Sequence, residues 1–392
     1  MQVLTTRFLV LVLSYFLSSS SAGSGAPRTE SISPKWSADL RTAVAGTRLG
    51  VIAGGKGHEY EYGPQTSLWF TDDDTVVVTF VIRSADSNPK LAHRGVSDER
   101  FALRLRAVFL DANSGRIIDT PEWPADSRLA NIVAAHDGKF VTYTGEGLIL
   151  YSPDRKELKK LTMPTMEAAQ RADLSSSPTG KTLLYLVKAN SSVRWVWLDT
   201  DTLEVIRTWE EKPRGLLRIS DSNVVMTACT MWYSKCEPEI DIKGRDDTNW
   251  KRIEVINDRR HPPVAGFVDE DLLFLQGPST RLLRTDGTMV MTEDISPQGC
   301  WGVGIVTSAG GKRFVIPSCR VKGRVESLDL SGYDELSKFL VYDAPFQGQS
   351  YVLNFKGPKI KMPISLAVSP DGSKLAVLNG ESVYVFQLPV LR

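Results

Sequence analysis

The sequence predicts an all-β protein: a seven-bladed β-propeller of four-stranded antiparallel blades, closed by an N-terminal strand. Two observations lead to this fold. One turn motif recurs seven times along the chain, at spacings of roughly 40 to 64 residues, and a second turn recurs six times. The segments between the turns are short, rich in β-branched and aromatic residues, and show little helical periodicity. Repeats of about this length are typical of propeller blades.

The last repeat shows the pattern most clearly. The runs 364–369 (ISLAVS) and 374–378 (KLAVL) flank the turn Pro370-Asp371-Gly372, and the run 383–388 (VYVFQL) follows the hairpin signal Asn379-Gly380. We call the turn between strands one and two of a blade the first turn. It can be followed through the chain near Asp73, Asp137, Thr179, Ser222, Glu270, Gly310 and Asp371.

A second turn, between strands three and four, indicates how the ring closes. It occurs in six repeats, at 113–115, 153–154, 199–201, near 246–247, at 286–287 and near 347–348. The seventh repeat lacks it, because the sequence ends at Arg392 after the third strand. A blade without its outer strand keeps an open edge. We therefore expect the N-terminal segment to supply that strand, with 47–53 (TRLGVIA) as the candidate. Helix is expected only in short stretches such as 166–172.

The motif Ser369-Pro370-Asp371-Gly372, followed by the strand 374–378, resembles the WD40-like and YVTN-type β-propellers that are common among exported bacterial proteins. The resemblance covers nearly all of the chain after its first residues. The chain departs from the WD40 pattern because no Trp-Asp dipeptide ends a third strand. The resemblance implies the fold. It does not imply an activity, because these families include scaffolds, ligand binders and enzymes.

The N-terminus has the pattern of an export signal. Arg7 precedes the apolar run 8–17, which is too short to span a bilayer, and small residues before Ala22 suit cleavage there. We expect a signal peptide at 1–22, a linker at 23–44 and the propeller at 45–392, with the mature protein in the periplasm or outside the cell. The net charge of +1 argues against nucleic acid as a partner. We expect no membrane span and a monomer.

Four cysteines in an exported chain suggest two disulfides, for which three pairings exist. Cys300 and Cys319 are centred on the turn at Gly310, as opposed positions of an antiparallel pair must be. Cys229 and Cys236 bracket the hairpin between strands two and three of blade four. We therefore predict the pairs Cys229–Cys236 and Cys300–Cys319. A metal site is the alternative, but the sequence has no CxxC and its histidines are scattered.

Loops between strands two and three share one face of a propeller with the blade-to-blade connections, and we call this the top face. The first turns lie on the opposite, first-turn face. The top face would carry Trp232 and Tyr233 on the loop closed by a disulfide, Trp301 beside an inner strand, and His93 and Arg94 in an insertion. Rigid aromatic side chains are good contact anchors. The alternative is that these side chains pack on neighbouring blades.

Two long top-face loops, 84–99 in blade one and 320–336 in blade six, favour a binding rim there over the first-turn face, although tolerated surface insertions are the plainer interpretation. We expect a non-enzymatic scaffold that binds a protein or small ligand, without cofactor or metal. The alternative is a propeller enzyme, lactonase-like or quinoprotein-like. The sequence holds no HExxH and no GxSxG motif in the folded region. Asp72-Asp73-Asp74 could bind a cation, but acids in a strand turn are usually solvated.

Peptide mapping under non-reducing conditions tests the cysteine pairs. We expect the fragments Cys229–Cys236 and Cys300–Cys319, because both pairs close local hairpins and each stabilises the chain by about 2–3 kcal/mol. Free thiols, or a cross-pair such as Cys229–Cys300, would contradict the placement of the aromatic residues on a rigid top face.

Overall fold

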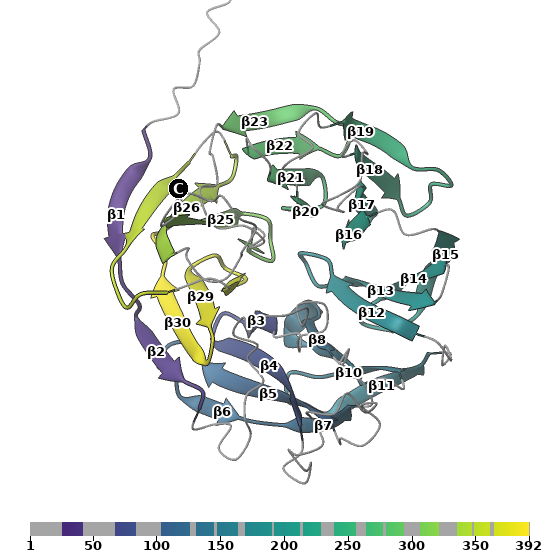
Figure 1. Ribbon diagram of the computed structural model, residues 1–392, viewed down its shortest axis with the longest axis horizontal. Helices are drawn as coiled ribbons and strands as arrows, with labels where there is room; N and C mark the ends of the chain where they lie inside the picture. The colour runs from purple at the N-terminus through teal and green to yellow at the C-terminus, as the bar shows by residue number, and fades with distance from the viewer. Residues whose placement is uncertain are drawn as a thin grey trace, which may run out of the picture.

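The computed structural model describes residues 26–41, 67–83, 103–125, 131–144, 147–163, 169–189, 192–211, 215–228, 239–255, 264–276, 280–293, 306–320, 335–346, 349–360 and 364–391. Within these ranges, seven antiparallel sheets surround a central channel as the blades of a propeller (Figure 1). The predicted seven-bladed, all-β architecture is confirmed. All seven first turns lie between the first two strands of a blade, as expected.

The strands follow one another from the channel to the rim in each blade. Blade one contains β3 (Ser67–Asp72), β4 (Thr75–Arg83), β5 (Leu103–Asp111) and β6 (Ile117–Asp119), and β7 (Glu122–Ala125) also pairs with β5. Blade two contains β8 (Asn131–Ala134), β9 (Phe140–Tyr143), β10 (Gly147–Tyr151) and β11 (Glu157–Thr162). Blade three contains β12 (Ala169–Ser176), β13 (Thr182–Ala189), β14 (Ser192–Asp199) and β15 (Val205–Glu211).

The remaining blades repeat this arrangement. Blade four contains β16 (Gly215–Ile219), β17 (Asn223–Ala228), β18 (Glu239–Gly244) and β19 (Lys251–Val255). Blade five contains β20 (Val264–Phe267), β21 (Leu272–Gln276), β22 (Thr280–Arg284) and β23 (Met289–Glu293). Blade six contains β24 (Val306–Thr307), β25 (Arg313–Arg320), β26 (Glu335–Asp343) and β27 (Tyr351–Phe355). Blade seven contains β28 (Ser365–Val368), β29 (Lys374–Asn379) and β30 (Ser382–Gln387).

The N-terminal segment closes the ring, but with different residues from those predicted. β2 (Trp36–Asp39) pairs antiparallel with β30 as the outer strand of blade seven, and β1 (Arg28–Ile32) pairs parallel with β27 in blade six. The candidate 47–53 lies outside the described residues, and its expected place beside β30 is taken by β2. Both strands fall within the range 23–44 that was expected to be a linker. In Figure 1 they follow each other along the rim.

The physical reason lies in the burial of an outer strand. The candidate 47–53 (TRLGVIA) is rich in apolar residues, whereas an outermost strand is covered on one side only. β2 alternates between half-buried and exposed residues over WSAD, which suits that position. The expected helix at 166–172 is also wrong from Ala169 onward, because β12 begins there and pairs with β13. Strand pairing outweighs the helix propensity of this stretch.

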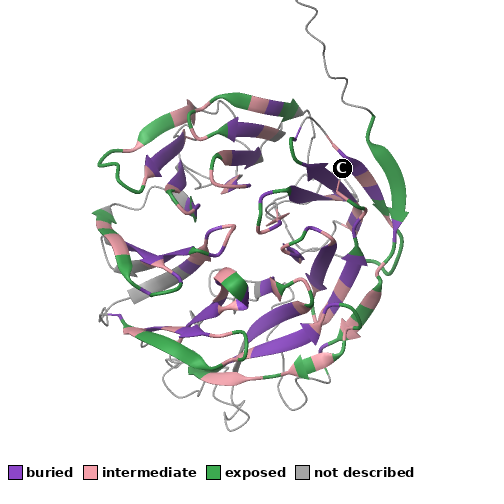
Figure 2. Ribbon diagram, turned by 180° about the vertical axis from the view of Figure 1, so that it is seen from behind, coloured by how far each residue is buried: buried purple, intermediate pink, exposed green. Residues whose placement is uncertain are grey.

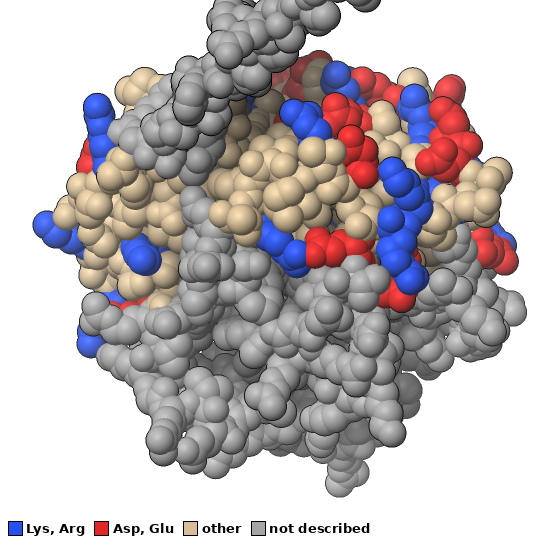
Figure 3. Space-filling model, turned by 90° about the horizontal axis from the view of Figure 1, so that it is seen from above, with Lys and Arg blue, Asp and Glu red and all other residues tan. Residues whose placement is uncertain are grey.

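The core lies between blades, because each blade packs its faces against two neighbours. Leu184 and Trp197 of blade three, for example, share one buried cluster with Leu217 and Met226 of blade four. Burial in blade two falls from its second strand to the rim: every residue of β9 is buried, whereas the first four of β11 are exposed (Figure 2). In Figure 3, acidic and basic residues are interspersed over the described part of the surface in view, without a large patch of one sign.

Hydrogen bonds join the first turns of neighbouring blades. The His136 N–H donates to the Gly180 carbonyl at 2.9 Å, between blades two and three. The Thr179 hydroxyl donates to the Asp221 carboxylate at 2.7 and 2.8 Å, between blades three and four. The Asp221 N–H donates to the Glu270 carboxylate at 2.8 Å, between blades four and five. These bonds hold the first turns in place relative to one another.

A buried arginine, held by an ion pair within blade six, ties that blade to blade seven. The Arg313 and Asp343 side chains are 0% and 2% exposed, and their two hydrogen bonds measure 2.5 and 2.9 Å. Arg313 Nη1 also donates to the carbonyls of Gly372 and Pro389, at 2.8 and 2.7 Å. A buried guanidinium is stable only where its donors are satisfied. The pair therefore ties blade six to the first turn and the C-terminal segment of blade seven.

Trp36 fastens the closing strand to blade one. Its indole N–H donates to the Ala112 carbonyl at 2.9 Å. Its ring lies against Gly115, where an added Cβ would come within 2.6 Å of the indole. Gly115 also has a φ of +75°, which L side chains rarely adopt. A glycine in the second turn of blade one thus allows the closing strand of blade seven to pack closely on it.

Replacing this tryptophan tests the closure. We expect Trp36→Ala to lower the free energy of unfolding by about 2–3 kcal/mol, because a half-buried indole and its hydrogen bond are lost. The measurement is urea unfolding followed by circular dichroism. Lys35→Ala, next to it and exposed, is the control and should change stability by less than about 0.5 kcal/mol. Equal stabilities of both variants would show that Trp36 does not secure the ring.

Candidate functional site

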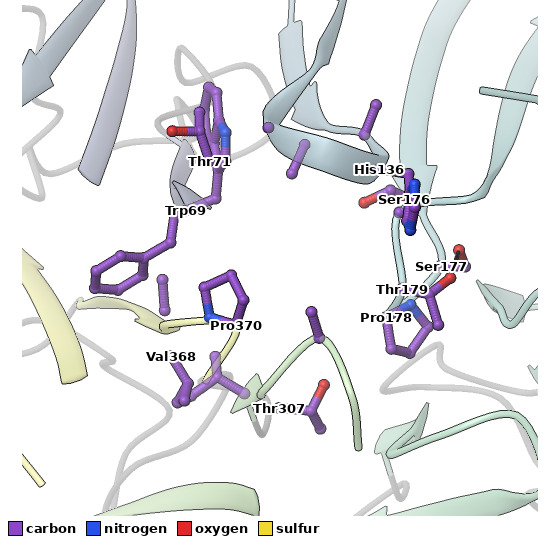
Figure 4. Close-up of a pocket in the computed structure, with 18 of the residues that line it drawn as sticks. Trp69, Thr71, His136, Ser176, Ser177, Pro178, Thr179, Thr307, Val368 and Pro370 are labelled. Atoms are coloured by element: carbon purple, nitrogen blue, oxygen red, sulfur yellow. Dashed lines mark hydrogen bonds between the residues drawn. The ribbon is translucent and has the colours of Figure 1, made fainter. Parts of the chain in front are cut away.

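A cavity of about 610 Å³ occupies the end of the central channel at the first-turn face. The innermost strand or first turn of every blade contributes to its wall, from Leu68 in blade one to Pro370 in blade seven. Figure 4 shows the open space between these segments, with Trp69 and Thr71 on one side and His136, Ser176 and neighbouring residues on another. The cavity therefore belongs to the whole ring and exists only when the ring is closed.

The wall combines apolar side chains with uncharged polar groups. Hydroxyl groups come from three blades, with Thr71 in blade one, Ser176 and Thr179 in blade three and Thr307 in blade six. Each innermost strand is the edge of its sheet, so the backbone N–H and C=O groups on its inner edge have no partner strand. Such groups can hydrogen-bond a ligand. The wall is thus polar without being uniformly charged.

The acidic side chains of the wall lie on blades one and two. Asp72 and Asp73 occupy the first turn of blade one, and Asp137 occupies that of blade two. The Asp137 side chain is 71% exposed and lies 3.0 Å from Nδ1 of His136. Its backbone has a φ of 56°, a left-handed conformation in which aspartate is one of the few tolerated residues. This part of the cavity can accept hydrogen bonds from a cation.

Apart from His136, the basic side chain among the described residues of the wall is Arg218 of blade four. It is exposed to the cavity, and its guanidinium donates to the Leu217 carbonyl at 2.9 Å. No carboxylate in the described part of the chain forms an ion pair with it. Arg218 therefore keeps donors free for an anionic group.

The junction between blades seven and one brings two carboxylates together beside the cavity. The Asp371 N–H donates to Asp73 Oδ1 at 2.8 Å, and Lys374 Nζ donates to the Asp73 carbonyl at 2.5 Å. Lys374 Nζ also lies 3.4 Å from Asp74. Partial burial raises the pKa of Asp73, and the nearby Asp371 carboxylate adds to this. Burial alone would raise the pKa of Asp371, but hydrogen bonds from Ser369 and Ser373 outweigh it and lower that pKa.

Most residues singled out from the sequence lie outside the described residues: Trp232, Tyr233, Trp301, His93, Arg94, Cys229, Cys236 and Cys300. Cys319 lies in β25, is 4% exposed and has no free thiol. The two disulfide pairs and the top-face site therefore stay predictions. The sequence argument did not identify the first-turn cavity, although it located all seven turns that border it. The long loops favour the top face, yet the short first turns around the channel enclose a cavity.

Comparison with known proteins supports the fold and assigns no activity. No family model and no curated protein matches the sequence. A chain in the crystal structure of the mitotic checkpoint complex is similar with a TM-score of 0.50 and 13% identity, over 99% of this chain and 100% of that one. The WD40 domain of Neurospora crassa Pan2 is similar with a TM-score of 0.50 and 10% identity, over 93% and 98%. The protein is thus a seven-bladed β-propeller with WD40-like structural neighbours.

The described residues contain neither a candidate metal cluster nor a helix that could span a membrane. No group of three or more histidine, cysteine, aspartate or glutamate side chains in that part of the chain is placed to hold a metal ion. Among the same residues, no helix has the length and apolar character needed to cross a bilayer.

The paired carboxylates predict a pH-dependent effect of Asp73→Asn. Because the folded-state pKa of Asp73 is raised, its ionisation disfavours the folded state, so its contribution to stability is present at low pH and lost as the pH rises through that pKa. The amide removes the charge but keeps an oxygen that can accept from the Asp371 N–H. We expect a Tm above that of the wild type at pH 7, and a difference that shrinks toward about pH 3.

Asp371→Asn is the control, because the ionised Asp371 contributes to stability in the opposite direction. Its lowered pKa stabilises the folded state at neutral pH, and this contribution is lost as the pH falls. Asp371→Asn should therefore lower the Tm at pH 7. A gap between Asp73→Asn and the wild type that stays constant across this pH range would contradict the proposed electrostatic origin.

Proposed function

We propose that this protein is a binding scaffold whose ligand site is the cavity at the first-turn end of the central channel. The observation that carries the proposal is the cavity itself, about 610 Å³, to which all seven blades contribute. Cavities of about 300–1,000 Å³ are typical of small-molecule sites, which combine apolar walls with a few polar groups. This wall has that composition, with charged side chains from three blades.

The rigidity of the wall favours binding. The first turns of blades two to five are joined by hydrogen bonds of 2.7 to 2.9 Å, and the buried Arg313 of blade six donates to two carbonyls of blade seven. A preformed site loses little conformational entropy when a ligand enters. A rigid propeller with polar groups at fixed positions therefore suits the recognition of a ligand.

Export is part of the proposal and rests on the sequence alone. Residues 1–22 have the pattern of a signal peptide, so we propose that the scaffold acts in the periplasm or outside the cell. A second contact surface on the top face, with Trp232, Tyr233 and Trp301, is likewise supported by the sequence pattern. If Trp232 and Trp301 lie on the top face as predicted, Trp232→Ala and Trp301→Ala should leave binding in the first-turn cavity unchanged, and these variants then separate the two faces in a binding experiment.

Gly266 provides a way to block the cavity without straining the fold. It lies in β20, contributes to the cavity wall, and an added Cβ there would meet no atom within 4 Å. We expect Gly266→Phe to fold normally and to fill part of the channel. The control is Gly310→Leu, in the first turn of blade six, where the nearest atom to an added Cβ is Cγ of Lys312 at 3.8 Å.

Thermal unfolding with a panel of probes tests the proposal: free amino acids, dipeptides, mono- and disaccharides, nucleotides and carboxylic acids. We expect at least one class to raise the Tm of the wild type and of Gly310→Leu but not of Gly266→Phe. A ligand at 100 times its Kd stabilises the folded state by about 2.7 kcal/mol. A panel without any stabilising class, or a full response of Gly266→Phe, would contradict a ligand site in the cavity.

A further inference from the structure

We propose that the cavity binds a small zwitterion, such as a short peptide with free amino and carboxyl ends. The inference rests on the proposed function and adds the class of ligand. The amino group would lie on the side of blades one and two, near Asp72 and Asp137. The carboxylate would lie on the side of blade four and bind Arg218.

The distribution of charge around the ring carries this inference. Among the described residues of the wall, the acidic side chains come from the end of β3 and the first turns of blades one and two, and Arg218 comes from the innermost strand of blade four. In a ring of seven blades, two blades separate blade one from blade four on one side and three on the other. The innermost strands β3 of blade one and β16 of blade four therefore face each other across the channel. In Figure 1, β3 and β16 lie on different sides of the central opening.

The state of each charged group fits this assignment. Arg218 is exposed to the cavity and pairs with no carboxylate among the residues described, so its planar guanidinium can bind a ligand carboxylate through two hydrogen bonds. Asp137 is 71% exposed, and its carboxylate lies 3.0 Å from Nδ1 of His136. Asp72 is exposed and accepts from the Asp74 N–H at 2.8 Å, which leaves further acceptor positions for an ammonium group.

Ligands of a single charge fit less well. A purely anionic ligand that reached Arg218 would share the cavity with Asp72, Asp73 and Asp137, and a purely cationic ligand would share it with Arg218. Between the two charged sides, the wall offers hydroxyl groups and the free backbone edges of the innermost strands. Such groups can pair with the peptide group of a dipeptide. One molecule with both charges therefore satisfies more of the wall than either charge alone.

Isothermal titration calorimetry with three matched probes tests the inference: alanyl-alanine, N-acetyl-alanyl-alanine, which lacks the amino charge, and alanyl-alanine amide, which lacks the carboxylate. We expect alanyl-alanine to bind at least about tenfold more tightly than either blocked form. The loss of a hydrogen-bonded charge typically weakens binding by about 10- to 100-fold.

Charge-removing variants identify the partners. Arg218→Gln should lower the affinity for alanyl-alanine by about tenfold or more, to a value close to that of the wild type for the amide probe. Asp137→Asn should lower the affinity for alanyl-alanine toward that of the wild type for the N-acetyl probe. Lys181→Gln is the control, because Lys181 is exposed in the first turn of blade three but is not part of the cavity wall. Equal unfolding midpoints establish that all variants are folded.

The outcomes separate this inference from the proposed function. If the blocked probes bind as well as alanyl-alanine, or if Arg218→Gln has no more effect than Lys181→Gln, the zwitterion inference is wrong. If alanyl-alanine does not bind while another class stabilises the wild type and not Gly266→Phe, the cavity remains a ligand site and only the zwitterion inference falls. If no probe of any class stabilises the wild type more than it stabilises Gly266→Phe, both the proposed function and the zwitterion inference are wrong.

Discussion

Ring closure is the constraint on which this structure depends. Each blade buries apolar residues against two neighbours, so the first and last blades are fully covered only when they meet. β2 completes the last blade by pairing with β30, and Trp36 on the same strand packs on Gly115 of the first blade. One four-residue strand thus covers the edge of β30 and fastens it to the beginning of the ring. Without it, β30 would keep a free edge, which is prone to pair with other chains.

Closure also creates the cavity. The cavity belongs to no single blade, because the described residues of its wall come from all seven. The seven inner edges enclose the channel only after the ring is complete, and the hydrogen bonds between first turns then hold its mouth in shape. The same turns that join strands one and two therefore serve as structural contacts and as the wall of the proposed site. Residues such as Asp73 take part in both, which explains their unusual electrostatic surroundings.

The sequence predicted the repeated part of the fold well because turn chemistry is local. The residues Pro370-Asp371-Gly372 are enough to predict a turn, and within it Asp371 Oδ1 accepts from the Ser373 N–H at 2.8 Å. The closing strand could not be placed in the same way. Its short run WSAD carries a weak strand signal, and its position is decided by the free edge of β30, more than 300 residues away. The stretch after Ala169 was misjudged for a similar reason, since pairing with β13 decides its conformation.

By itself, the sequence determined the number of blades, the order of their strands and the turns between them, because those depend on residues that are neighbours in the chain. It also established that an N-terminal segment would be needed to complete the last blade. Only the tertiary structure decided which segment does so, and only it brought Asp137 of blade two and Arg218 of blade four to one cavity. The physical reason is that a strand edge and a channel wall are properties of the closed ring. They arise from contacts between blades, which local patterns of residues do not encode.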